Sequence, residues 1–258
     1  MKLRLALRTD NKQYIMKHVQ LLFILLISSL CASGQAVDPT IGSHYSPGGR
    51  FDNVFDKEGK QHSLRQVTIN SQILIPCAST SYYRTYFEPG CGMDGNSQID
   101  IDRRAVLCQV LSDLSSFIIP PSGSPLANGN IFVNVDVVDI ATMNLPGALA
   151  VASGFYTVPL GAPTTTGGIA DNQAWITINS GVDGYTNVVS PVSTASPNNF
   201  YHMVVAFDFN AVNWHTSLTT LATGQDYDLY TVALHEITHA LGFASLIDAN
   251  GDSRFQDF

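Results

Sequence analysis

Residues 235–243 read His-Glu-Ile-Thr-His-Ala-Leu-Gly-Phe, and no other stretch constrains the fold of this chain as strongly. On a helix, His235 and His239 are four positions apart, so both imidazoles leave one face and can converge on one ion. Glu236 follows the first histidine and can reach a water bound to that ion. Gly242 allows the chain to leave the helix and turn back. The spacing therefore predicts a helix that binds Zn²⁺ and carries a general base.

Two other interpretations of these residues are weaker. The two histidines could be ordinary buried side chains satisfied by hydrogen bonds, but Glu236 and Gly242 at these offsets favour a metal site. A structural zinc site usually has four Cys or His ligands, whereas every cysteine here is far from residue 235 along the chain. A carboxylate beside the metal position favours hydrolysis over a structural role.

The flanking sequence supports a helix that runs through the interior of a domain. Asp226 is expected to cap its first turn, and Asp228 to complement the positive end of its dipole. Residues 229–241 are mostly apolar apart from the metal-site residues and two threonines. A helix of this composition is buried on most sides, which places the metal at the floor of a cleft.

Composition places the chain among folded proteins and argues against nucleic acid as a partner. Hydrophobic residues make up 45% of the sequence and charged residues only 13%, which suits one domain with a sizeable core. The formal charge of −8 at pH 7 would repel a phosphate backbone. Residues 66–258 are expected to form the domain.

Residues 1–34 have the organisation of an export signal. The apolar block at 21–30 follows a short basic segment and precedes the small residues Ala32-Ser33-Gly34, where we expect cleavage after Gly34. The block is too short for a stable membrane span. The residues before Met16 lengthen the leader unusually, so Met16 is the expected true start. The protein is therefore predicted to be secreted or at the cell surface.

Export brings a protein into an oxidising compartment, so cysteines of the mature region are expected in disulfides. Three are present, Cys77, Cys91 and Cys108, so either one thiol is free or its partner lies outside this chain. The sequence leaves their pairing open. Cys77 also suits an inhibitory thiolate that caps the zinc. Cys31 is a poor lipidation site because Leu30 is too large for the position before it.

The rest of the sequence predicts the elements of a mixed α+β domain. Residues 35–65 are polar and are expected to form an N-terminal extension. A helix opens at Asp102 and stops before Pro120-Pro121. Alternating or apolar runs predict strands at 67–75, 131–138, 148–153, 175–179 and 203–209, the second of them half-buried. Strands and a helix that precede a metal-site helix are typical of an α+β fold.

The stretch from His235 to Phe243 resembles the metzincin zinc endopeptidases, and its Ala-Leu-Gly-Phe end is most similar to the leishmanolysin group. The resemblance implies that both histidines bind zinc, that Glu236 is the catalytic base and that Gly242 forms the turn. It also implies the upper subdomain of that family, a twisted mixed sheet with a backing helix before the zinc helix. The run from Pro146 is similar to the family's edge strand, which implies substrate binding at Ala148, Leu149, Ala150 and Val151.

The sequence departs from that family at the third zinc ligand. The family has a His or Asp three residues after the glycine, where this chain has Ser245, and no methionine turn follows. The catalytic domain is therefore expected to be C-terminally incomplete, with the lower subdomain missing. We expect a His beyond Phe258 to be the third ligand, with Asp248 as the alternative.

Asp248 also begins the pattern Asp248-x-Asn250-x-Asp252, which resembles a calcium-binding loop. Ser253 replaces the usual glycine and the remaining ligands are missing. A solvated acidic turn is the favoured interpretation of this stretch, and a Ca²⁺ site is the weaker one.

These observations together predict a secreted zinc-dependent endopeptidase that acts on an extended peptide or protein. Two alternatives stay open. One is a catalytically inactive metal-binding module for surface contact or adhesion, which the poor ligand at Ser245 favours. The other is a zinc hydrolase of non-peptide amides or esters. The oligomeric state cannot be read from the sequence.

Overall fold

The computed structural model describes residues 53–57, 60–69, 73–75, 77, 82–157, 171–187 and 199–243. The predicted start at Met16, the cleavage site after Gly34 and the candidate ligand Asp248 lie outside these residues. Within the described part, no helix has both the length and the apolar character needed to cross a membrane.

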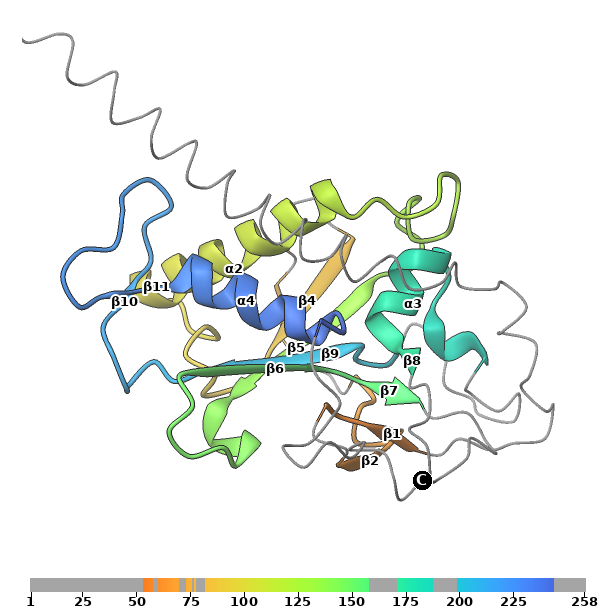
Figure 1. The fold of residues 1–258 in the computed structure, drawn as a ribbon, viewed down its shortest axis with the longest axis horizontal. Coiled ribbons are helices and arrows are strands. Elements are labelled where there is room, and N and C mark those ends of the chain that lie inside the picture. Colours follow the sequence, from red (N-terminus) through yellow and green to blue (C-terminus); the bar gives the residue numbers. More distant parts are fainter. Residues whose placement is uncertain are drawn as a thin grey trace, which may run out of the picture. The chain divides into compact units, whose positions relative to one another are not determined.

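A five-stranded mixed sheet forms the centre of the described part (Figure 1). Its strands, in spatial order, are β3 (Ile73–Leu74), β4 (Tyr83–Phe87), β5 (Val133–Asp139), β9 (Met203–Phe207) and β6 (Ala150–Gly154). β4, β5 and β9 are parallel to one another, whereas β3 and β6 run antiparallel at the two edges. The predicted α+β class with a mixed sheet is confirmed at this level.

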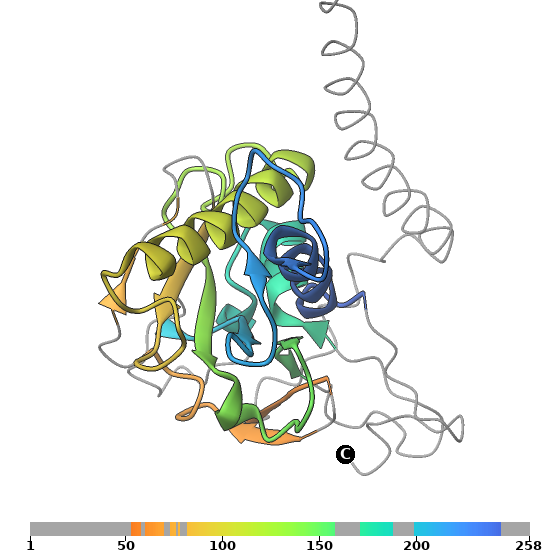
Figure 2. The same cartoon turned by 90° about the vertical axis from the view of Figure 1, so that its left-hand side faces the viewer.

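Two helices cover one face of this sheet, α2 (Gln98–Phe117) and α4 (Leu229–Ala240) (Figures 1 and 2). Their apolar sides pack with the same face of β5 in one core, which includes Leu107, Leu111, Val135, Ala233 and Ile237. The Tyr230 hydroxyl donates to the Asp113 carboxylate at 2.6 Å and joins the two helices. α2 thus backs the helix that carries the metal-site motif.

The other face of the sheet is also covered. A second core cluster there contains Val54, Tyr86, Val138, Phe155 and Val204. β5 is therefore buried on both sides, and the prediction of a half-buried strand at 131–138 is wrong. The reason is that both faces of β5 are covered, one by the core under α2 and α4 and the other by this second cluster.

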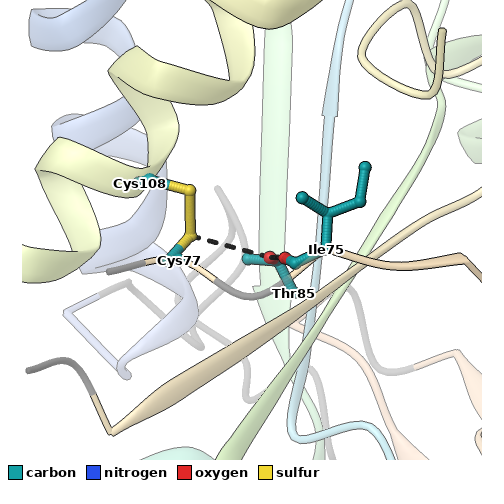
Figure 3. Close-up of a disulfide and its surroundings, with 4 residues drawn as sticks. All are labelled: Ile75, Cys77, Thr85 and Cys108. Carbon is teal, nitrogen blue, oxygen red and sulfur yellow. Dashed lines mark hydrogen bonds between the residues drawn. A yellow bond between two sulfur atoms is a disulfide. The ribbon is translucent and has the colours of Figure 1, made fainter. Parts of the chain in front are cut away.

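α2 begins four residues before the predicted start at Asp102. Ser97 caps it, because its hydroxyl accepts a hydrogen bond from the Asp100 backbone N–H at 3.3 Å. The helix ends at Phe117, ahead of Pro120 as predicted. A disulfide joins Cys108 on α2 to Cys77 beside the sheet (Figure 3), which rules out a zinc-capping thiolate at Cys77.

Cys91 is a free thiol, buried in the core between α2 and the sheet. Burial raises the pKa of this thiol to about 12, so it stays protonated at neutral pH. Of the two sequence-based alternatives, the structure supports the one with a free thiol.

Residues 175–179 are helical, and the predicted strand there is wrong. They belong to α3 (Gln173–Ser180), which lies beside β8 (Asp171–Asn172). The Asn172 side chain caps the helix by accepting from the Trp175 N–H at 2.8 Å, and Gly181 ends it with a φ of 72°. Both caps are local signals that outweigh the alternating pattern of Trp-Ile-Thr-Ile.

Part of the predicted N-terminal extension takes part in a sheet. β1 (Asn53–Phe55) and β2 (Gln61–Ser63) form a hairpin, and β1 pairs with β7 (Tyr156–Thr157) in the order β2-β1-β7-β8. Of the described residues in the predicted strand at 67–75, Ile73 and Leu74 form β3 and Thr68 forms an isolated bridge with Phe200. The remaining strands, β10 (Trp214–His215) and β11 (Tyr227–Asp228), form a short parallel pair that leads into α4.

Asp136 on β5 is expected to make stability depend on pH. Burial, and secondarily the charge of Glu88, raise the pKa of its carboxyl from 3.8 to about 8. Between these two pKa values the folded state keeps a proton that the unfolded state has lost. The resulting loss of folding stability is absent below pH ~4 and grows until pH ~8. Asp136→Asn removes the ionisation and should stabilise the fold at pH 8 by about 1–3 kcal/mol more than at pH 4. Urea unfolding at both pH values measures this difference, and equal effects at the two values would contradict it.

Candidate functional site

α4 carries the motif from His235 to His239, and its N-cap lies two residues after the predicted one. Asp228, not Asp226, is the N-cap, because its carboxylate accepts from the Thr231 backbone N–H at 3.1 Å. Leu229, Ala233, Ile237 and Ala240 are buried along one side of the helix. This apolar side packs on the sheet and leaves the histidine side towards solvent.

The two histidines converge as the motif predicts. Their Nε2 atoms are 3.0 Å apart, with ring centroids at 4.4 Å and ring planes at 84°. Two ligands of a tetrahedral zinc ion, each bound at 2.0–2.1 Å, are about 3.3 Å apart. The pair therefore fits the two-histidine part of a zinc site with little adjustment.

The second ring nitrogen of His239 is held by the chain that follows the helix. His239 Nδ1 lies 2.8 Å from the Phe243 carbonyl oxygen. A carbonyl can only accept, so Nδ1 carries the proton and Nε2 keeps its lone pair for a metal. The chain reaches this position through a turn at Gly242, whose φ of 101° suits glycine.

Glu236 points to the sheet edge. Its Oε2 accepts from the Ala152 backbone N–H at 3.0 Å. This bond holds the carboxylate of Glu236, the residue next to His235, at the edge strand β6. The sequence predicted the role of Glu236 but gave no indication of its partner Ala152.

α4 and β6 are closely packed, and Gly154 makes this contact possible. A Cβ at Gly154 would lie far inside contact distance of the Ala240 carbonyl oxygen and the Asn172 side chain. The Asn172 amide donates to that same carbonyl at 3.0 Å, which satisfies a free acceptor at the end of α4. Sequence reasoning missed both residues, and only the small-residue run at 152–154 could have pointed to one of them.

Gly154→Ala is expected to destabilise the fold by about 2–3 kcal/mol, because the added methyl group meets helix backbone that cannot rotate away. The helix would have to move off the strand, so the contact between Glu236 and Ala152 should weaken too. Thermal unfolding measures the loss of stability, and an unchanged Tm would contradict this packing.

β6 is the outer strand of the five-stranded sheet and begins at Ala150, within the predicted strand at 148–153. The Leu149 carbonyl accepts from the Asp208 N–H at 2.8 Å, so that residue faces β9. Because backbone direction alternates, Val151 also faces β9 while Ala150 and Ala152 face outward. Of the four residues predicted to contact substrate, Ala150 is placed to present its backbone at this edge, and Ala148 already donates to Leu145.

Within the described part of the chain, no third candidate ligand lies beside the histidine pair. No group of three His, Cys, Asp or Glu side chains close enough to hold an ion occurs among the described residues. His202 is buried with its Nε2 3.4 Å from Asp183, and His215 lies beside the Thr220 carbonyl. Neither joins the pair on α4.

No protein-family model matches the chain, and comparisons with curated proteins and with solved structures found no similar protein. The function is therefore inferred from the geometry of α4 and β6.

Proposed function

We propose that this protein is a secreted zinc-dependent endopeptidase of metzincin-like architecture. The observation that carries the proposal is the position of Glu236, which is bonded to the edge-strand N–H of Ala152 beside two convergent imidazoles. A purely structural zinc site has no need of this carboxylate. A general base held at the open edge of a sheet is suited to an extended peptide.

Each residue of the site has a distinct role in this proposal. His235 and His239 bind zinc through Nε2, and the Phe243 carbonyl orients the second ring. Zinc held by these residues would supply a Lewis acid that makes a bound water molecule more acidic. Glu236 accepts the proton of that water and later delivers it to the leaving amine.

The substrate is proposed to add as a strand along β6. Ala150 faces outward there, and its N–H and C=O groups can pair with a peptide backbone. β6 is apolar and carries no charged side chain that would repel a peptide. Main-chain pairing would then supply affinity with little dependence on substrate sequence.

The third ligand is proposed to lie outside the described residues. Asp248 is the candidate in the printed sequence, and a His beyond Phe258 is the preferred one. A catalytic zinc normally has three protein ligands and one open position. Zinc held by two histidines alone would be bound weakly.

A metal-binding module without catalysis is the second candidate. Its support is that the described residues provide only two ligands. In that case Glu236 would only tie α4 to the sheet.

Removal of metal separates these candidates. The full-length protein should digest labelled casein, lose at least ~10-fold of its rate in a zinc chelator, and recover when Zn²⁺ is restored. A rate of casein digestion that is unchanged by the chelator would contradict the proposal. Zinc binding without any hydrolysis would favour the module, and hydrolysis of esters but not casein would favour a non-peptide hydrolase.

A further inference from the structure

The β1–β2 hairpin occupies the continuation of the edge strand that carries the site. β7 follows β6 after one residue, Phe155, whose N–H donates to His202 and whose carbonyl accepts from Gln173. Both partners lie on the inner side, towards β9 and β8. β1 pairs with β7 on the opposite side, which is the outer side of β6 (Figure 1).

The hairpin is firmly attached at this position. Val54 is fully buried in the core below the sheet. Asp56 organises the turn, because its carboxylate accepts from the Lys60 N–H at 2.8 Å and lies 2.8 Å from His62 Nε2. The Lys57 N–H donates to the Ser153 hydroxyl at 2.8 Å, within β6 itself.

The hairpin begins close to the level of the histidine pair. α4 and β6 run in the same direction, since Glu236 meets Ala152 and Ala240 meets Gly154. Four residues of a helix and two residues of a strand each advance about 6 Å, so the spacing of these two contacts is the same along α4 and along β6. The midpoint of the two histidines is therefore level with Ala152 and the next residue. Phe55 pairs with Tyr156, only about 10 Å further along the strand.

We propose that the β1–β2 hairpin limits how much of a substrate can pair with the sheet on the N-terminal side of the cleaved bond. A peptide that adds antiparallel to β6 directs its N-terminal residues towards Tyr156. β1 already lies there, in the same direction as such a peptide. About two residues before the cleaved bond can pair, and earlier residues must leave the sheet. This inference rests on the proposed peptidase function.

The substrates expected are accordingly chains cut near their N-terminus, or in segments that bend away from the enzyme before the cleaved bond. On the C-terminal side, no other described strand lies along the outer side of β6. Residues after the cleaved bond should therefore contribute most of the backbone pairing.

Two series of fluorogenic peptides with one common cleavage sequence test this limit. With the full-length wild-type protein, kcat/KM should rise as residues are added after the cleaved bond, and change less than ~3-fold beyond the second residue before it. A rise of more than ~10-fold from the third to the fifth preceding residue overturns the inference alone. Absence of cleavage throughout both series overturns the peptidase proposal and this inference with it.

Asp56→Ala loosens the hairpin without touching the site, and Asp226→Ala is the matched control on an exposed loop. Asp56→Ala should raise kcat/KM for N-terminally extended peptides by about 3–10-fold and leave short ones unchanged. Hydrogen exchange gives a measurement that needs no activity, because the amide of Tyr156, which pairs with Phe55 of β1, should exchange faster in Asp56→Ala only. An unchanged exchange rate of this β7 amide in a folded Asp56→Ala protein would mean that the hairpin does not cover this edge of the sheet.

Discussion

Glu236→Gln is expected to lower casein digestion by at least ~100-fold while the protein keeps its zinc, because an amide cannot accept the proton of the attacking water. Glutamine has nearly the same shape, and its carbonyl oxygen can still accept from the Ala152 N–H. The position of the side chain should therefore be retained. The measurements are kcat/KM on a fluorogenic peptide, the zinc content and the Tm.

Asp226→Asn is the control, since it makes the same change of acid to amide at an exposed position away from the α4 motif. It should leave kcat/KM within ~2-fold of wild type, as surface substitutions usually do. Near-normal turnover in Glu236→Gln would show that this carboxylate is a structural tie between α4 and β6 and not a general base.

The parts that were predicted well depend on local patterns. The helix from residue 229 to 240 and the turn at Gly242 follow from spacing, because ligand convergence and helix termination involve residues a few positions apart. The cap was misplaced because Asp226 and Asp228 are equally good caps by residue type. Their difference lies in where β11 ends, which the sequence does not indicate.

The parts that were missed depend on distant contacts. Ala152 binds Glu236 across 84 positions of sequence, and Asn172 binds the end of α4 across 68. The periodic pattern of apolar residues in a sequence does not indicate which distant residues will be in contact. The segment at 53–63 was taken for an extension because it is polar, yet the buried residues Val54 and Asp56 and pairing with β7 attach it to the fold. Backbone pairing of this kind needs little apolar sequence.

Burial on both faces explains the remaining differences. The alternation in 131–138 predicted one solvent-facing side for β5, but the hairpin and the second core cluster cover that side. Asp136 is carried into the interior there, and its raised pKa is the consequence. Sequence alternation identifies two faces of a strand but not what lies against each.

Zinc binding by the purified full-length protein is the decisive measurement for the histidine pair on α4. We expect one zinc ion per chain by elemental analysis, and a loss of affinity of at least ~100-fold in His239→Ala, because a ligand and its hydrogen bond to Phe243 are removed together. Thr238→Ala, on the same turn of α4, is the control and should bind zinc as the wild type does. If His239→Ala binds zinc with wild-type affinity, the histidine pair is not a metal site and the proposed zinc-dependent function is contradicted.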